Sequence, residues 1–201
     1  MKYFTPLCIA FLFILLISSI SNAQLVKFGI GGGLTAINSP DIYTKSIGNG
    51  GYGFSSNYHF TALLKLDIPL VPITPGVFID YHVLRGSGST ALGNVNTSQN
   101  IFTVGAEGQY NIFPLPFAKP YAEVDLAYNN FGDINYTDFS GTYAMAGNSR
   151  FGAALGVGVV ISAIPSMDLD VSAKYHFMNL VGKQSGESNI NAATLNLILL
   201  F

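Results

Sequence analysis

Among the residues of this chain that could do metal or acid–base chemistry are its three histidines, His59, His82 and His176. They stand far apart in the sequence and form no local ligand motif. A metal site needs ligands that converge with a fixed geometry. We therefore expect the histidines to take part in hydrogen-bond networks, and we predict no metal site.

Nucleophilic and phosphate-binding chemistry have equally weak signals. A serine hydrolase needs a nucleophile beside a base that is itself held in place, but the serines gather in loop-like segments: Ser87, Ser89, Ser185 and Ser188. The segment GIGGGLTA, residues 29–36, resembles a phosphate-binding glycine loop without the lysine and the strand–loop–helix context that such a loop requires. We predict no catalytic residue, no cofactor and no enzyme activity.

The composition points away from an ordinary soluble domain. Of the 201 residues, 49% are hydrophobic and only 10% are charged, whereas about a quarter are charged in typical soluble domains. The formal net charge is −2 and there is no basic run, so no nucleic-acid partner is expected. Beyond the first 23 residues no apolar run reaches 18 residues, the length that indicates a transmembrane helix.

Residues 1–23 have the pattern of a secretory signal peptide. Lys2 precedes an apolar stretch over 7–20, and the small residues of Ser21-Asn22-Ala23 suit cleavage after Ala23. An uncleaved anchor is the alternative, but the apolar run is short. Cys8, the only cysteine, lies in this segment, so the predicted mature domain, 24–201, has no disulfide, which fits a bacterial envelope.

The rest of the chain alternates apolar and polar residues with a period of two. In MDLDVSAKYHF, residues 167–177, one face is apolar or aromatic and the other carries Asp, Ser, Lys and His. Such a period indicates strands, and about ten residues suffice for a tilted strand to cross a bilayer. We predict an all-β domain with eight strands, at 25–36, 60–69, 76–85, 102–112, 120–129, 150–161, 167–177 and 190–201.

The connections alternate strictly between short and long, which predicts an up-and-down antiparallel sheet. Three are short and rich in proline, at 69–75, 113–120 and 162–166. Four are long and rich in Gly, Ser, Asn and Thr, at 37–59, 86–101, 130–149 and 178–189. Closing the sheet removes its exposed edges, and turning its apolar face to lipid removes the apolar patch from water. The prediction is an eight-stranded transmembrane β-barrel.

The polar face of such a barrel lies inside it. Eight strands enclose a lumen that side chains can fill, and buried charges there must be matched. Glycines on the inward face of 150–161 would leave room for long neighbours. We predict a polar network facing the lumen, formed by Lys27, Lys65, Asp67, Asp80, His82, Glu107, Glu123, Asp125, Asp168, Asp170, Lys174 and His176.

Taken together, the signal peptide, the eight strands, the alternating connections and the terminal Phe201 give the chain a family resemblance. It resembles the small outer-membrane β-barrel proteins of Gram-negative bacteria, such as outer membrane proteins A and X. The resemblance implies a monomer in the bacterial outer membrane, in contact with its lipid and lipopolysaccharide. It also implies insertion by the barrel assembly machinery, with Leu199 and Phe201 as the assembly signal. The family favours glycine where this chain has Asn196.

Aromatic residues near the strand ends fit two interfacial girdles. We assign to them Tyr58, Phe60, Phe102, Tyr110, Tyr121, Tyr128, Phe151, Tyr175, Phe177 and Phe201.

Four functions remain open at this point. The first is a non-enzymatic outer-membrane protein whose barrel anchors four extracellular loops for surface interaction or envelope integrity. The second is a narrow porin-like channel for small or amphiphilic solutes, suggested by the small inward residues Gly152, Ala154, Gly156 and Gly158. The third is a lipid-modifying enzyme. The fourth is a soluble lipocalin-like barrel whose apolar face points inward around a ligand.

Overall fold

The structure is a computed structural model that describes residues 26–201 except 69, 92, 114, 116 and 165–166. The predicted signal peptide, 1–23, lies outside the described residues.

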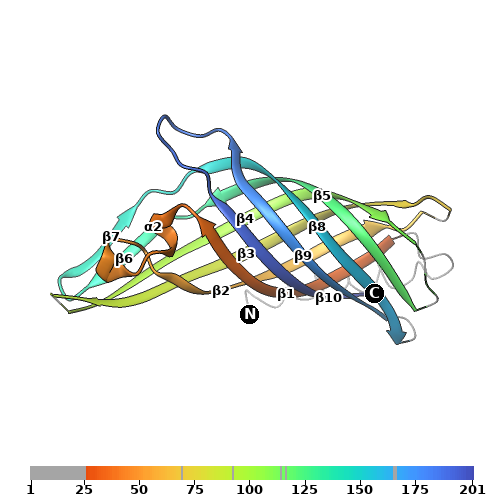
Figure 1. Ribbon diagram of the computed structural model, residues 1–201, viewed down its shortest axis with the longest axis horizontal. Coiled ribbons are helices and arrows are strands. Elements are labelled where there is room, and N and C mark those ends of the chain that lie inside the picture. The colour runs from red at the N-terminus through yellow and green to blue at the C-terminus, as the bar shows by residue number, and fades with distance from the viewer. Residues whose placement is uncertain (1–25, 69, 92, 114, 116, 165–166) are drawn as a thin grey trace, which may run out of the picture.

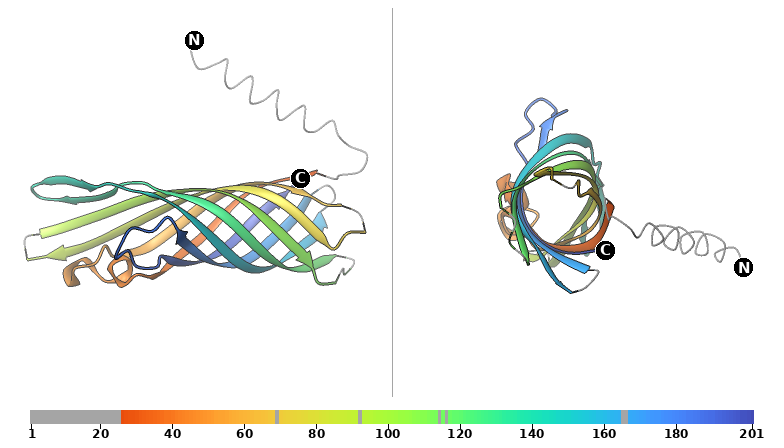
Figure 2. Two further views of the ribbon diagram at one scale, coloured as in Figure 1. Left: turned by 90° about the horizontal axis from the view of Figure 1, so that it is seen from above. Right: turned by 90° about the vertical axis from the view of Figure 1, so that its right-hand side faces the viewer.

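Eight long strands form the body of the molecule. Each pairs antiparallel with its neighbours in the order β3-β2-β1-β10-β9-β8-β5-β4, and a further pairing between β3 and β4 closes the ring. Figure 1 shows the tilted strands from the side, and the right-hand view of Figure 2 looks into the barrel. The predicted eight-stranded up-and-down barrel is confirmed. Its strands are β1 (Val26–Ser39), β2 (Phe54–Leu66), β3 (Ile73–Thr90), β4 (Gly93–Asn111), β5 (Ala118–Phe131), β8 (Ser149–Ile164), β9 (Met167–Val181) and β10 (Asn191–Leu200).

The apolar face of every barrel strand points outward. On β9, Val171 is exposed while Asp170 and Ser172 on either side of it are buried. Leu126 on β5 is 68% exposed and Leu195 on β10 is 60% exposed. A band of large apolar side chains around a closed barrel is stable in lipid and unstable in water. The lipocalin-like alternative, which needs this face inside, is therefore wrong.

Aromatic side chains form an outward ring near the end of the barrel that carries the long connections. Neighbouring members are in contact: the ring centroids lie 5.7 Å apart in Tyr58–Phe60 and 5.1 Å apart in both Tyr128–Phe151 and Tyr175–Phe177. Tyr110 and Phe201 are exposed toward the other end. The girdle assignment fails at one residue, because Tyr121 is 1% exposed and lies in the lumen.

The long connections are more structured than the sequence predicts. The alternation predicts a loop over 86–101, but β3 and β4 continue through this segment in unbroken register, from Arg85↔Ser98 to Thr90↔Gly93. Once strands leave the membrane, their outward side chains no longer need to be apolar. The alternation of apolar and polar residues therefore ends at the membrane surface, although the strand pairing continues beyond it.

Two other long connections contain elements of their own. The segment 37–59 holds a short helix, α2 (Asp41–Thr44), and a 3₁₀ turn, η1 (Ile47–Asn49). The segment 130–149 holds a hairpin of β6 (Ile134–Asp138) and β7 (Gly141–Met145), and β6 pairs with the extended part of β4. These elements gather at one end of the barrel (Figure 1). No helix among the described residues has the length and apolar character to cross a membrane.

Candidate functional site

Polar side chains gather in the lumen and in a pocket at the long-connection end. Membrane-spanning barrels have short periplasmic turns and longer extracellular loops, and by this rule we assign the end with α2 and the β6–β7 hairpin to the extracellular side. From the periplasmic end to the extracellular end, side chains fill the lumen in successive layers.

At the periplasmic end, ion pairs join three strands and a turn. The Lys27 ammonium lies 2.7 Å from a carboxylate oxygen of Asp168 and 3.3 Å from one of Asp67. Lys119 lies 3.6 Å from the same Asp67 oxygen. The paired groups come from β1, β5, β9 and the residue that follows β2. Their charges are therefore compensated at the lumen entrance.

Above this level, Lys65 is held between two carboxylates inside the barrel. Its ammonium is 2.5 Å from Asp170 and 3.5 Å from Glu107. The Tyr121 hydroxyl donates a hydrogen bond to the other Asp170 oxygen at 2.6 Å, and the Lys65 ammonium lies 5.6 Å from the Tyr121 ring centroid. Tyr121 is thus a partner in the polar network, which its inward place in the alternation of β5 indicates.

The centre of the lumen is a single ammonium surrounded by three carboxylates. Lys174 lies 3.1 Å from Asp125, 3.3 Å from Glu123 and 3.5 Å from Glu107. These three carboxylates lie close enough together to hold a metal ion, but the Lys174 ammonium already occupies the position between them as their counter-ion. Gln109 donates a hydrogen bond to Glu123 at 3.3 Å.

Glycines on β8 make room for these long side chains. A Cβ atom at Gly156 would lie 2.6 Å from Glu123 Oε1 and 3.0 Å from Lys174 Cγ. A Cβ atom at Gly158 would collide with the Tyr121 ring and lie 2.9 Å from Ser172 Cβ. Gly156 and Gly158, two of the four small inward residues that suggested a channel, therefore face space that neighbouring side chains occupy.

The three histidines, distant in sequence, lie together in the next layer of the lumen. The ring centroids of His59 and His82 are 5.2 Å apart, and those of His82 and His176 are 6.3 Å apart. The hydroxyl of Thr35 lies 3.0 Å from His59 Nδ1 and 3.1 Å from His82 Nδ1. This convergence was not expected from the sequence, although all three residues occupy inward positions and His59 pairs directly with His82.

Other polar residues complete this layer. His59 Nε2 lies 2.7 Å from Asn196 Oδ1, and His176 Nε2 lies 3.0 Å from the Thr194 hydroxyl. Asp80 accepts a hydrogen bond from Thr61 at 2.7 Å. Asn196, which stands where the family favours glycine, is thus part of the lumen network: it also donates to Ser172 at 2.9 Å.

An apolar layer lies in the barrel on the extracellular side of the histidines. Its members are buried residues from seven barrel strands, from α2 and from the residue before β10: Ile37, Tyr43, Phe54, Leu84, Ile101, Phe131, Met178, Ile190 and Ala192. Leu84 and Ile101 are 0% exposed. A close-packed apolar layer of this kind leaves little space for water.

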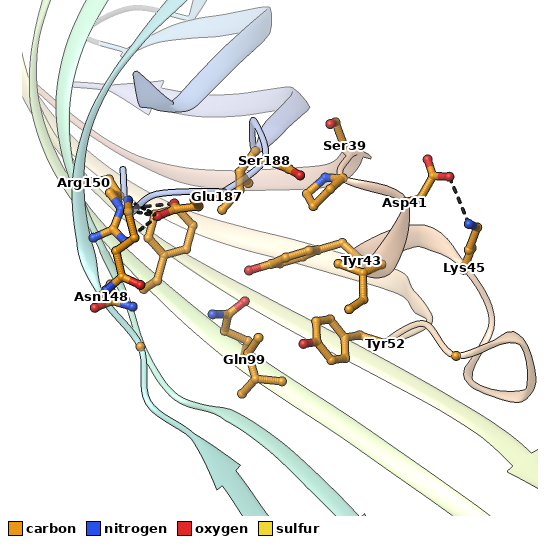
Figure 3. A pocket seen from close by; sticks show the side chains of 18 of the residues that line it. Ser39, Asp41, Tyr43, Lys45, Tyr52, Gln99, Asn148, Arg150, Glu187 and Ser188 are labelled. Carbon is orange, nitrogen blue, oxygen red and sulfur yellow. Dashed lines mark hydrogen bonds and ion pairs between the residues drawn. The ribbon is translucent and has the colours of Figure 1, made fainter. Parts of the chain in front are cut away.

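An open pocket of about 840 Å³ lies on the extracellular side of the apolar layer. Its lining comes from the connections 40–53 and 182–190, the connection before β8 and the start of β8, together with single residues of β1, β4, β5 and β6: Ser39, Gln99, Phe131 and Ile134 (Figure 3). Its volume is in the range of small-molecule sites. No sequence motif indicates this pocket, since its lining is scattered over several connections and strand ends that lie far apart in the sequence.

One wall of the pocket is a bidentate ion pair between β8 and the connection 182–190. Arg150 donates from Nη2 to Glu187 Oε2 at 2.6 Å and from Nε to both Glu187 oxygens at 3.0 and 3.1 Å. Asn179 and the amide of Gln184 also donate to Glu187. Hydrogen bonding by Arg150 lowers the pKa of Glu187 to about 2. The pair therefore holds this connection against the barrel at neutral pH.

The opposite wall is aromatic. Tyr43 contacts Tyr52 edge to face and also contacts Phe54, with centroid separations of 5.5 Å in both pairs. Burial raises the pKa of Tyr43 to about 12, although a hydrogen bond from Gln99 acts in the opposite direction. In Figure 3 the hydroxyls of Tyr43 and Tyr52 and the amide of Gln99 point toward the space in front of Arg150.

These observations define the class of the protein: a membrane-spanning β-barrel with a lipid-facing apolar exterior, a lumen lined by polar side chains and a structured extracellular end. The chain matches the family model described as "Outer membrane protein beta-barrel domain" over residues 8–200. It belongs to this family, and it is a protein of the bacterial outer membrane.

Solved structures show the same fold at low sequence identity. Neisserial surface protein A is 17% identical, with a TM-score of 0.61 over 90% of this chain and 98% of that one. A major outer membrane protein from Thermus thermophilus is 12% identical, with a TM-score of 0.55 over 88% and 99%. Ail, the attachment invasion locus protein of Yersinia pestis, is 14% identical, with a TM-score of 0.50 over 88% and 97%. No curated protein matches the chain.

Proposed function

We propose that the protein is a non-enzymatic, monomeric outer-membrane protein whose barrel is an anchor and whose extracellular end makes the functional contacts. The observation that carries this proposal is the filled lumen. Charged side chains, the histidine layer and the apolar layer follow one another along the barrel axis, and the fully buried Leu84 and Ile101 belong to the last of these. Function is then left to the extracellular end.

Current through a planar bilayer tests this proposal. Protein purified from outer membranes is incorporated into the bilayer, and incorporation is verified by antibody detection of the recovered membrane. We expect no discrete openings, because a hydrated path would require two parts of the lumen to rearrange. These are the Lys174 cluster, which consists of Lys174, Glu107, Glu123 and Asp125, and the apolar layer. Stable single-channel openings would overturn the proposal and establish the porin-like alternative.

The hydrogen bonds of the histidines favour a non-enzymatic role over a lipid-modifying enzyme. Among the described residues, the recorded partners of the three rings are Thr35, Thr194 and Asn196, and no serine is among them. A hydrolase of the serine type needs a base within reach of its nucleophile. Incubation with lipopolysaccharide, followed by mass spectrometry of the acyl chains, should show no change, and a shortened or transferred chain would contradict this role.

The extracellular hairpin offers a direct test of where function resides. Replacing residues 134–145 by a short Gly-Ser turn removes β6 and β7 but keeps every barrel strand. Under our proposal this variant inserts normally and loses an envelope or surface-contact phenotype of the wild-type protein. The matched control shortens the periplasmic connection at 70–72. Unchanged phenotypes after removal of all four extracellular segments would contradict the loop-based role.

We further propose that Leu199 and Phe201 form the assembly signal read by the barrel assembly machinery. Both side chains point outward and are exposed, and Phe201 exchanges backbone hydrogen bonds with Phe28 at the seam between the first and last strands. The Phe201→Ala variant should reach the outer membrane in smaller amount. The same experiment can verify cleavage after Ala23, by amino-terminal sequencing of the inserted protein.

A further inference from the structure

From the extracellular pocket we infer a binding site for an uncharged saccharide. This inference rests on the proposed function, because it places the functional contact at the extracellular end of the barrel. It depends on three features of the pocket: the balance of its charges, an unpartnered buried acceptor, and the aromatic wall.

The charged residues that line the pocket cancel in two ion pairs. Arg150 and Glu187 form the bidentate pair at 2.6 Å, and Lys45 lies 3.1 Å from Asp41 at the rim. These four are the charged residues of the described lining. Each positive side chain in the lining is already paired with a negative one. A charged ligand would therefore be repelled by one member of the pair that attracts it, so the pocket favours an uncharged ligand.

Gln99 supplies an acceptor that the protein leaves unused. Its side chain is on β4 and only 3% exposed. The amide nitrogen donates to the Gly132 carbonyl at 3.0 Å, while Oε1 is buried without a hydrogen-bond partner. Buried acceptors are nearly always paired. A ligand hydroxyl or amide entering the pocket would supply the missing donor, whereas an acyl chain would leave this acceptor unpaired.

The remaining lining combines rings with amides and hydroxyls. Tyr52 is half-buried and turns its hydroxyl to the Met145 sulfur at 3.9 Å, a weak acceptor that a better partner would replace. Asn148 and Ser188 add polar groups on the side of the ion pair (Figure 3). A sugar ring has hydroxyls around its edge and C–H groups on its faces, so it can hydrogen-bond the amides and pack against a tyrosine ring at the same time.

A glycan array tests the inference with the protein purified from outer membranes in detergent. The array displays neutral hexose and N-acetylhexosamine oligosaccharides beside sialylated and sulfated ones. We expect binding to a subset of the neutral glycans. Binding confined to sulfated or sialylated glycans, or to none, would overturn the inference. If no glycan binds but the protein forms no channel in a planar bilayer, the inference is wrong and the anchor role is still supported. The two proposals can therefore fail separately.

Variants then locate the bound sugar. In titration calorimetry with the neutral glycan that binds most strongly, Gln99→Met should weaken binding about tenfold, as loss of one buried hydrogen bond predicts. Asn148→Ala tests a more exposed part of the lining and should also weaken binding. Asn94→Ala, on the β3–β4 hairpin outside the pocket, should leave affinity unchanged. Heat-modifiable gel migration verifies that each variant is folded, and equal affinities in all three would place the sugar elsewhere and overturn the inference.

Discussion

The Lys174 cluster in the lumen and the extracellular pocket both contain basic and acidic side chains in ion pairs. The space around the charges is occupied in the cluster and open in the pocket. Lys174 is surrounded by carboxylates at 3.1–3.5 Å, and glycines opposite them are needed to admit the side chains. In the pocket, Arg150 and Glu187 satisfy each other and leave about 840 Å³ open in front of them. In the lumen the charged side chains occupy the space between the strands. In the pocket the Arg150–Glu187 pair forms one wall and leaves the space in front of it open.

The difference follows from the surroundings of each charge. A buried ion pair in a narrow lumen is stable only while every partner is present, because a leftover charge cannot reach water. At the extracellular end water is adjacent, so an ion pair there acts as a local clamp on a connection. We therefore expect the cost of removing a charge to fall from the lumen to the pocket to the rim.

The largest effect is expected for Lys174→Met, which leaves Glu107, Glu123 and Asp125 without the ammonium between them. Removing one partner of a buried ionic group costs about 3–5 kcal/mol. Urea-induced unfolding in lipid vesicles measures the difference. Lys183→Met is the matched control, since Lys183 is exposed in the connection 182–190 and bonds only Asn189 among its recorded partners. Equal stability of the two variants would mean that the lumen is hydrated and the charges are screened.

Overfilling the lumen tests the same contrast through volume. At Gly158 a larger side chain meets the Tyr121 ring and Ser172, so Gly158→Val should destabilise the barrel by about 1–3 kcal/mol. Val157→Leu, on the lipid-facing side of the same strand, should be nearly neutral. Thermal unfolding followed by heat-modifiable gel migration compares them. If Gly158→Val were tolerated as well as Val157→Leu, the lumen at this level would have spare room.

The sequence predicted the barrel because the bilayer imposes a strict rule on it. Outward residues must be apolar and inward ones need not be, so alternation identified all eight strands and the inward place of Lys65, Asp170 and Lys174. The same rule ends at the membrane surface. Nothing in the composition of 86–101 or 130–149 distinguishes a paired strand from a loop, and those elements were missed.

Contacts between side chains across the lumen could not be predicted from the sequence, for a different reason. Alternation states which face a residue occupies but not which strands face each other or how their registers are offset. His82 and His176 belong to strands that do not pair with each other, so their proximity depends on barrel closure. The pocket depends on three connections and several strand ends whose positions are set by the barrel beneath them, and no local motif encodes that.

A smaller effect is expected at the clamp between Arg150 and Glu187. The pKa of Glu187 is lowered from 4.5 to about 2 in the folded protein. A depressed pKa means that the carboxylate stabilises the folded connection above about pH 4.5, and that this contribution is lost as the pH falls toward 2. Amide hydrogen exchange over 182–190 measures the opening of the connection. At pH 7 the Glu187→Gln variant should exchange faster than wild type, and the ratio should approach one near pH 2.

The smallest effect is expected at the rim, where Asp41 and Lys45 form an exposed pair beside α2. Their side chains are 82% and 55% exposed, and exposed pairs four residues apart contribute about 0.3–0.5 kcal/mol or nothing measurable. Asp41→Asn should therefore leave thermal unfolding and exchange over 182–190 unchanged. A loss comparable to that of Glu187→Gln would show that α2 is clamped to the barrel through this pair. The pocket would then have two charged supports, and the gradient from lumen to rim would not hold.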